Sequence, residues 1–309
     1  MKIITLTLNP AFDVHCYCEH FEPFRENLAR IVDRDAGGKG VNISRALTAN
    51  GVQNTALVVL GEQNALDFCH SLDEYGINYE QIVVSGRIRE NITLHTADSP
   101  ETRISFAGFD TDDSLLERVM DVLDAQIDSD TVVTFTGRVP AGISVGTAKD
   151  MLKKMSARGA RIVIDSRSFS LEDIIDCRPW LIKPNDEEIS MYSEIRIADL
   201  ADAARAARAL REQGIENVMI SLGALGAVLA CEDGCFCVNA PSVEVLSTIG
   251  AGDSSIAGFL ATANQGACYS EMLRLAVCYG SAACLSEGTQ PPRKEDVERL
   301  MKQVCLREL

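Results

Sequence analysis

Residues 248–255 read Thr-Ile-Gly-Ala-Gly-Asp-Ser-Ser, and apolar residues at helical spacing follow them directly. The stretch therefore predicts a tight glycine turn that opens into a helix. Small residues at a helix start leave several backbone N–H groups open to an anion, and the helix dipole strengthens that attraction. Asp253 lies among these groups and can accept the proton of an attacking hydroxyl, which suits phosphoryl transfer. The candidate catalytic residues are Gly250, Ala251, Gly252 and Asp253, with an ordinary first-turn acid as the structural alternative for Asp253.

A second glycine-rich turn lies at residues 36–42, Ala-Gly-Gly-Lys-Gly-Val-Asn, and it also opens into an apolar helical period. Its glycines let the backbone come close to a ligand, and the helix start favours an anion. The turn is not a Walker A loop, because Lys39 is followed by Gly40 and not by a hydroxyl side chain that could bind Mg²⁺. It predicts either a ligand-binding loop or a tight loop that only needs a positive φ angle.

Short apolar runs alternate with helical periods along most of the chain. Buried strands are predicted at residues 2–8, 55–60, 131–136, 161–165, 180–183 and 217–221. Residues 199–213 carry an apolar helical stripe with Asp199 as its predicted N-cap. A second stripe near the C-terminus consists of Val297, Leu300, Met301 and Val304. The alternation predicts an α/β fold in three layers, with helices on both faces of a mostly parallel central sheet.

Two regions, 11–36 and 87–109, do not follow this alternation of strands and helices. They alternate like half-exposed strands and have no helical period between them. In the second region Arg89, Asn91, Thr93 and His95 share one face, and the apolar residues Ile88, Ile92 and Leu94 share the other. The pattern predicts a small inserted sheet that covers a site as a lid, with a surface hairpin of no special role as the alternative.

Two further segments follow predicted strands and suit a nucleotide. Lys183, Asn185 and Glu188 stand at a predicted helix start, where Glu188 is the candidate to position hydrated Mg²⁺. A capped helix start with solvated acids is the alternative for that segment. The other segment supplies Ser221, Gly223 and Gly226, whose small size admits phosphates or an adenine. Both segments lie at the carboxyl ends of strands, where open α/β sheets bind their ligands.

The chain is acidic: its 309 residues include 29 Lys and Arg against 45 Asp and Glu, a net charge of −16. Such a charge makes nucleic acids and anionic membrane surfaces poor partners. An anionic substrate must be held by local cations such as Lys39 and Arg89. Neither a signal segment nor an apolar run of membrane-spanning length is apparent, so we expect a cytoplasmic protein.

The 11 cysteines are scattered among core-like stretches, which favours reduced thiols packed as small apolar residues. Cys16, Cys18 and His20 alternate along one expected strand face and leave zinc as the weaker alternative. A structural zinc site usually joins two such groups, and the other dense group, around residues 231–237, lacks a histidine. Packed thiols are the favoured interpretation.

Taken together, these motifs resemble the ribokinase-like (PfkB-type) carbohydrate kinases over essentially the whole chain. Gly-Gly-Lys-Gly-x-Asn at 37–42 and Gly-Ala-Gly-Asp at 250–253 are similar to the two signatures of that family. Residues 185–188 resemble its magnesium-linked motif, and residues 7–13 and 221–224 resemble its branch of 1-phosphofructokinases and tagatose-6-phosphate kinases. The resemblance implies one ribokinase-like domain over residues 1–309, with lid strands within 11–36 and 87–109 that in relatives often clasp a second subunit.

The resemblance also implies residue roles. Asp253 would be the base and the amides of 250–252 an anion hole. The sugar would be held by Asp13, Gly38, Lys39 and Asn42, and its existing phosphate by Arg89. ATP and magnesium would be served by Lys183, Asn185, Glu188, Ser221, Gly223 and Gly226. Arg138 departs from the family pattern, in which a small serine is usual, and we include it among the substrate-binding residues.

The activity implied is ATP-dependent phosphorylation of a ketose phosphate, with fructose 1-phosphate converted to fructose 1,6-bisphosphate as the first expectation. Tagatose-6-phosphate kinase shares every motif and is the nearest alternative. A sugar-phosphate-binding regulator without turnover is an alternative of another class, against which the intact Asp253 and Glu188 count. A nucleoside kinase of the same fold is disfavoured, because Lys39 and Arg89 suit an anionic acceptor.

Overall fold

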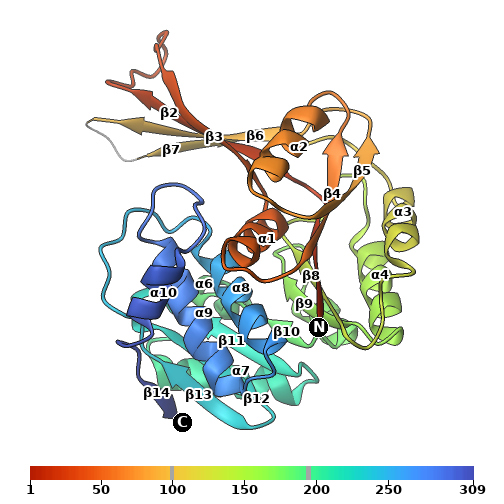
Figure 1. Ribbon diagram of the computed structural model, residues 1–309, viewed down its shortest axis with the longest axis vertical. Helices are drawn as coiled ribbons and strands as arrows, with labels where there is room; N and C mark the ends of the chain where they lie inside the picture. Colours follow the sequence, from red (N-terminus) through yellow and green to blue (C-terminus); the bar gives the residue numbers. More distant parts are fainter. Residues whose placement is uncertain (98–100, 193–195) are drawn as a thin grey trace.

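The large sheet of the computed structural model lies between two layers of helices (Figure 1). The structure describes residues 1–97, 101–192 and 196–309, and within these residues the sheet has ten strands. In spatial order they are β14 (Leu306–Glu308), β13 (Gly234–Val238), β12 (Ala227–Cys231), β11 (Asn217–Ser221), β10 (Leu181–Ile182), β9 (Arg161–Asp165), β8 (Thr131–Thr136), β1 (Lys2–Thr7), β4 (Thr55–Gly61) and β5 (Tyr79–Val84). Pairing is parallel from β11 to β5 and antiparallel at the edge formed by β12, β13 and β14. The predicted mostly parallel sheet is confirmed, and the antiparallel edge is an addition to it.

All six predicted strands are present, with differences at their ends. The run predicted at 180–183 pairs only as β10. Its first residue, Trp180, accepts a hydrogen bond on its carbonyl oxygen from the side-chain amide of Asn217 (2.7 Å). Its last residue, Lys183, lines a pocket beyond the sheet. The short strand therefore places the Lys183 side chain at the carboxyl edge of the sheet.

Helices cover both faces of the large sheet, as its alternating side chains require. One face is covered by α1 (Lys39–Ala49), α8 (Ala251–Asn264), α9 (Tyr269–Ala283) and α10 (Lys294–Leu300). The other is covered by α3 (Ser114–Leu123), α4 (Val145–Ala157), α5 (Leu171–Cys177), α6 (Asp186–Tyr192) and α7 (Leu200–Glu212). Ile3 packs in the cluster of the first layer and Ile4 in that of the second, so neighbouring residues of one strand serve both cores. The remaining helix, α2 (Ala65–Glu74), packs beside β4.

The two predicted helical stripes have different outcomes. Asp199 caps α7 as predicted, and its carboxylate accepts a hydrogen bond from the Asp202 N–H (2.9 Å). The C-terminal stripe was expected to reach Val304, but α10 ends at Leu300. Val304 is still buried, because the chain turns there to bring β14 against β13, and the Cys305 N–H donates to the side chain of Asn239 (2.7 Å). The apolar spacing therefore predicted the burial of Val304 correctly and the end of the helix wrongly.

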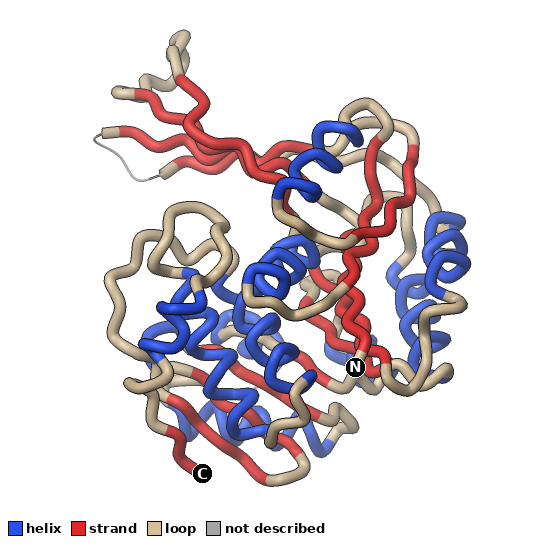
Figure 2. The backbone as a smooth tube through the Cα atoms, in the orientation of Figure 1, coloured by secondary structure: helices blue, strands red, loops and turns tan. Residues whose placement is uncertain are grey.

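The two irregular regions form a second sheet of four strands, which we call the small sheet. Its order is β3 (Arg30–Gly37), β2 (Ala11–Cys18), β6 (Arg89–Thr96) and β7 (Thr102–Ser105). Residues 98–100, inside the predicted range 87–109, lie outside the described part of the chain. The small sheet projects from the body (Figure 2), and near its base its apolar face packs on α2 through Phe12 and Phe68. Its polar face, with Asp13, Arg89 and Asn91, lines a pocket, so the predicted inserted sheet is confirmed.

Gly226 lies in the turn between β11 and β12, and the structure gives a packing reason for a glycine there. Gly226 follows the short 3-10 helix η1 (Gly223–Leu225) with a φ of 106°, and an added Cβ would collide with the Val238 carbonyl oxygen. Gly214 has the same φ of 106°, but nothing lies within 4 Å of an added Cβ there. Both positions strain an L-residue, but only Gly226 is also packed against backbone.

We predict that Gly226→Ala lowers stability by about 1–3 kcal/mol more than Gly214→Ala, because overpacking adds to the same dihedral strain. Chemical denaturation of the two variants and of the parent protein measures the difference. Equal losses would mean that the strand β13 yields to the new methyl group.

Candidate active site

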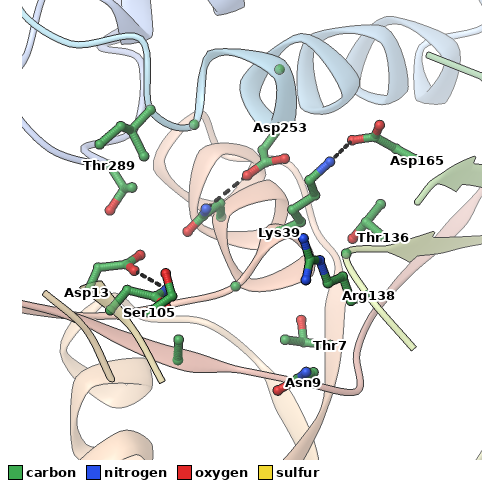
Figure 3. A pocket seen from close by; sticks show the side chains of 18 of the residues that line it. Thr7, Asn9, Asp13, Lys39, Ser105, Thr136, Arg138, Asp165, Asp253 and Thr289 are labelled. Carbon is green, nitrogen blue, oxygen red and sulfur yellow. Dashed lines mark hydrogen bonds and ion pairs between the residues drawn. The ribbon is translucent and has the colours of Figure 1, made fainter. Parts of the chain in front are cut away.

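A pocket of about 630 Å³ lies where the small sheet faces the carboxyl ends of β1, β8 and β9. The first turns of α1 and α8 complete its wall. Figure 3 shows Lys39, Arg138 and Asp253 pointing into it from three different elements. Twelve of the sixteen predicted site residues line this one pocket: Asp13, Gly38, Lys39, Asn42, Arg89, Arg138, Lys183, Asn185, Glu188, Gly250, Gly252 and Asp253.

Asp253 lies in the first turn of α8, where the glycine turn places it. Gly250 is the N-cap with a φ of 77°, a left-handed conformation that glycine adopts without strain. The Ser254 N–H donates to the Gly250 carbonyl oxygen (2.8 Å), so the helix begins at once after the turn. Asp253 is 6% exposed, and its carboxylate accepts a hydrogen bond from the side-chain amide of Asn42 (2.9 Å). The two glycine-rich turns are therefore joined at the carboxylate.

Burial raises the pKa of Asp253 to about 6. The Lys39 ammonium opposes this rise, while the neighbouring Asp165 carboxylate adds to it. A carboxylate with a pKa close to neutral accepts a proton more readily than an ordinary aspartate does. The environment of Asp253 thus suits a general base.

Lys39 pairs with Asp165 at the carboxyl end of β9, with 2.8 Å between the ammonium and a carboxylate oxygen. Asp165 is 5% exposed, and although burial alone raises its pKa, Lys183 and Lys39 hold the net pKa below its ordinary value. The Lys183 ammonium lies 3.1 Å from where a Cβ on Gly252 would sit, so it borders the amides of the α8 turn. Lys39, Lys183, Asp165 and Asp253 thus lie together and interact at the carboxyl edge of the sheet.

Sequence reasoning missed Asp165 and Arg167. The available signal was position: Asp165 ends a predicted strand, and the carboxyl ends of strands form the ligand edge of such sheets. Arg167, two residues later, donates to the Glu188 carboxylate with its Nε (2.7 Å). No spacing rule in the sequence connects the two positions.

Glu188 forms a reciprocal cap with Asn185 at the start of α6. The Glu188 N–H donates to the Asn185 side chain (2.8 Å), and the Asn185 N–H donates to the Glu188 carboxylate (3.1 Å). The capped helix start weighed as the alternative is therefore present. The same carboxylate also lines the pocket, so the cap leaves it available to a ligand.

The far side of the pocket is rich in cations and unsatisfied polar atoms. Burial lowers the pKa of Arg89, the Asp13 carboxylate opposes that effect, and the nearby Arg138 guanidinium adds to it. The buried Arg89 Nε has no hydrogen-bond partner, and Arg138 forms neither a hydrogen bond nor an ion pair with the described residues. The hydroxyls of Thr7 and Thr136, on adjacent strands, are also buried without partners and line the pocket. Buried donors without partners indicate a site that an oxygen-rich anion completes.

Asp13 faces the same space from β2. Its carboxylate accepts a hydrogen bond from the side-chain amide of Asn91 on β6 (2.9 Å). Burial raises its pKa, while Asn91 and the charges of His15 and Arg89 oppose that rise. A carboxylate held in this way can accept hydrogen bonds from the hydroxyls of a sugar.

Residues 8–296 match the family model described as pfkB family carbohydrate kinase. The chain belongs to this family. The kinase is 32% identical to the 1-phosphofructokinase of Escherichia coli (strain K12), over 84% of this chain and 83% of the relative. It is 30% identical to the 1-phosphofructokinase of Bacillus subtilis (strain 168), over 98% of each chain. The crystal structure of phosphofructokinase-2 from Escherichia coli in complex with substrates and products matches with a TM-score of 0.90 and 25% identity, covering 98% of this chain and 99% of that one.

Family membership makes the protein a phosphotransferase and confirms the ribokinase-like fold. Searched over its described residues, the kinase has no helix long and apolar enough to cross a membrane.

Four predicted site residues lie outside the lining of the pocket: Ala251, Ser221, Gly223 and Gly226. Ser221 pairs with Asn185 as an isolated parallel bridge, which places it next to the pocket wall. Gly226 has the packing reason given above. A role of Ser221, Gly223 and Gly226 in ATP binding stays a prediction.

Within the stretch that contains Cys16, Cys18 and His20, one cysteine has a hydrogen-bond partner nearby in the sequence. Cys18 is buried, and its thiol donates to the His20 carbonyl oxygen (2.8 Å). Across the described residues, no three His, Cys, Asp or Glu side chains are grouped so that they could hold a metal ion. The zinc alternative therefore finds no support in the geometry.

We predict that Asp253→Asn lowers kcat by about 10²–10⁴-fold, the range usual for loss of a general base. In the parent kinase kcat/KM should rise with pH through about 6, as Asp253 of the free enzyme loses its proton. The variant should lose this limb of the profile.

A melting-temperature measurement at pH 7 separates this role from a structural one. Folding raises the pKa of Asp253 from 3.8 to about 6, so stability from this group is present below pH 3.8 and is lost as the pH rises through 6. Asparagine removes the buried charge, and the variant should melt no lower than the parent. A variant that melts lower but turns over within a few-fold of the parent would identify Asp253 as an ordinary first-turn acid.

Proposed function

We propose that this kinase transfers the γ-phosphoryl group of ATP to a ketose phosphate, converting fructose 1-phosphate to fructose 1,6-bisphosphate. One observation carries the proposal: the same pocket holds a buried base, Asp253, and a separate pair of arginines, Arg89, whose buried Nε has no hydrogen-bond partner, and Arg138. The base suits an acceptor hydroxyl, and the arginines suit a phosphate that the acceptor already carries. The printed name of the Escherichia coli and Bacillus subtilis relatives, 1-phosphofructokinase, supports the same substrate.

The transfer step follows from the residues around Asp253. The 6-hydroxyl oxygen of the acceptor forms a bond to the γ-phosphorus, the bond from that phosphorus to the bridging oxygen breaks, and ADP leaves. Asp253 takes the hydroxyl proton. In the first turn of α8 the Gly252 and Asp253 N–H groups have no i−4 carbonyl partners, so they can bind the oxygens of the moving group, whereas the Ala251 N–H donates to the Thr248 carbonyl oxygen (3.3 Å). Lys39 and Lys183, both beside this turn, stabilise its negative charge.

The resemblance implied that Lys39 holds the sugar, and its surroundings suggest a further contact. Its ammonium pairs with Asp165 beside Asp253. We therefore propose that Lys39 lies between acceptor and donor and contacts the group in transfer. Asp13, Asn42 and the Gly38 backbone remain the proposed sugar ligands.

ATP is proposed to lie along Lys183, Asn185 and Glu188, with Mg²⁺ bound to its phosphates. The donor chemistry of the wall fits this cation: Mg²⁺ needs only one or two carboxylates beside water and phosphate oxygens. Glu188 lines the pocket and has lone pairs beyond those that accept from Arg167 and Asn185. When bound, the cation would neutralise charge on the triphosphate.

We predict that Glu188→Gln raises the Mg²⁺ concentration needed for half-maximal rate and leaves the KM for the sugar phosphate nearly unchanged. The single side-chain oxygen of glutamine can keep the bond from the Asn185 N–H, and the backbone N–H of residue 188 still donates to Asn185, so the helix cap survives, while the bond from Arg167 to the other oxygen is lost. Rates measured across a magnesium titration test this directly. An unchanged magnesium dependence would leave Glu188 with the capping role alone.

Turnover across a panel of acceptors tests the proposed activity. The panel contains fructose 1-phosphate, tagatose 6-phosphate, fructose 6-phosphate, free fructose and adenosine, with ADP release as the readout. We expect fructose 1-phosphate to give the highest kcat/KM, and free fructose to be at least about 100-fold poorer, because each charge-assisted contact to a phosphate contributes roughly 1.5–3 kcal/mol. Preference for tagatose 6-phosphate would select the nearest alternative, and sugar-phosphate binding without ADP release would select the regulator.

A second copy of the chain is the proposed partner of the outer part of the small sheet. Its apolar face is covered by α2 near its base, but Ile31 and Ile104 farther along the strands, and Phe106 just after β7, are exposed. Exposed apolar side chains gathered on one sheet face usually mark an interaction surface. Light scattering at working concentration should show a dimer, and a monomer would contradict this assignment.

A further inference from the structure

A buried ionic network lies directly behind the sugar side of the pocket. Asp35 on β3 and Arg45 on α1 are 6% and 8% exposed, and their charged groups are 3.4 Å apart. The Tyr75 hydroxyl, just beyond α2, donates to one carboxylate oxygen of Asp35 (2.6 Å), and the Gln290 side-chain amide donates to the other (3.3 Å). Arg45 in turn donates to the Gln290 side-chain oxygen (2.9 Å) and lies 3.8 Å from the centre of the Tyr75 ring. Four separate segments of the chain therefore meet at the Asp35 carboxylate.

Asp35 stands opposite Asp13 in the antiparallel pair of β2 and β3. Side chains at directly opposed positions lie on the same face of a sheet, about 4.5–5.5 Å apart at their Cβ atoms, and like charges there repel. The Asp35 charge raises the pKa of Asp13, as this arrangement requires. Each carboxylate has a partner that offsets the repulsion: Asn91 for Asp13 and Arg45 for Asp35.

The network also reaches the pocket by two other routes. Two residues after Asp35, an added Cβ on Gly37 would collide with the Asp13 carboxylate, so this backbone bounds the side chain directly. Next to Gln290, Thr289 lines the pocket with a buried hydroxyl that has no partner. The Asp35 carboxylate is therefore connected to the backbone that bounds Asp13 and to the residue next to Thr289.

We propose that Arg45 is a positioning residue for the acceptor: by holding Asp35 together with Tyr75 and Gln290, it keeps Asp13 fixed in place for the sugar hydroxyls. The inference rests on the proposed function of the pocket as a sugar-phosphate site. Arg45 itself does not line the pocket, so it acts only through Asp35 and its neighbours. The charged and titratable groups that face Asp13 are His15 on its own strand, Arg89 on β6 and Asp35 on β3.

The decisive variant is Arg45→Met, which keeps the length of the side chain and removes its charge. With Asp35 unpaired, the pKa of Asp13 should rise, because the uncompensated charge opposes its ionisation. We expect the KM of the sugar phosphate to rise about tenfold or more, since small displacements of a positioned group are costly. The values of kcat and of KM for ATP should stay within about threefold, and the loss should grow as the pH falls.

Four further variants keep the test decisive. Asp35→Asn combined with Arg45→Met removes both charges and should bring the sugar-phosphate KM back to within about threefold of the parent. Arg45→Lys and Tyr75→Phe cover the case in which Arg45→Met does not fold, and each should raise the same KM by a smaller factor. Arg274→Met is the matched control, because Arg274 pairs with Glu271 (2.8 Å) on α9 and does not line the pocket. It should lower the melting temperature and leave every kinetic constant unchanged.

The outcome is separable from that of the proposed function. The parent kinase is first assayed on the acceptor panel, and its best acceptor is used for the variants. If no acceptor turns over, the proposed function fails, and the network is tested by the pH dependence of melting. Raised carboxylate pKa values in the folded Arg45→Met variant should make its stability fall more steeply than that of the parent as the pH rises from 4 to 7. The double variant should not show this steeper fall. A folded Arg45→Met variant with an unchanged sugar-phosphate KM, or an unchanged melting slope where no acceptor exists, would overturn the inference.

Discussion

The burial of the Asp253 carboxylate at the start of α8 is the constraint around which the pocket is built. A buried carboxylate is unfavourable unless nearby charges and hydrogen bonds compensate it. Here Asn42 supplies a hydrogen bond, and Lys39 and Lys183 supply positive charge. Burial outweighs these contributions and the Asp165 carboxylate adds to it, so the pKa of Asp253 is raised to about 6. A stronger partner for Asp253 would give a more stable pocket and a weaker base.

The two glycine-rich turns meet this constraint from opposite directions. The turn before α8 brings backbone amides and the carboxylate to one point, and the turn before α1 brings Lys39 and Asn42 to the same point. An added Cβ on Gly40 would collide with the Thr7 hydroxyl and the Leu6 carbonyl oxygen, so α1 can approach β1 only without a side chain there. Close packing of the first helix on the first strand thus places charge at the centre of the pocket.

Local patterns predicted the fold and the motif-bearing part of the pocket, because both depend on residues near one another in sequence. Alternating strands and helices, the Asp199 cap and the small sheet were all readable in this way. The pairing of Lys39 with Asp165 was not, because it joins residues 126 positions apart whose contact exists only in the folded sheet. The C-terminal stripe failed for a related reason: Val304 is apolar because it is buried, and the turn toward β14 decides where α10 ends. The spacing of apolar residues thus predicts which residues are buried, whereas the folded structure decides which distant residues contact one another.

The parallel pairing of β2 with β6 has a consequence for how the molecule assembles. The register joins Ala11 to Arg89 and His15 to Thr93, and β4, α2 and β5 lie between the two strands along the chain. Closing so long a loop costs entropy before the contacts between β2 and β6 can offset it. The antiparallel pairs β2–β3 and β6–β7 are local, but joining them into one sheet requires this closure, so we expect the complete small sheet to form late, when α2 is in place and Phe68 packs on Phe12. The polar face that lines the pocket then depends on the docking of α2, a helix that does not itself line the pocket.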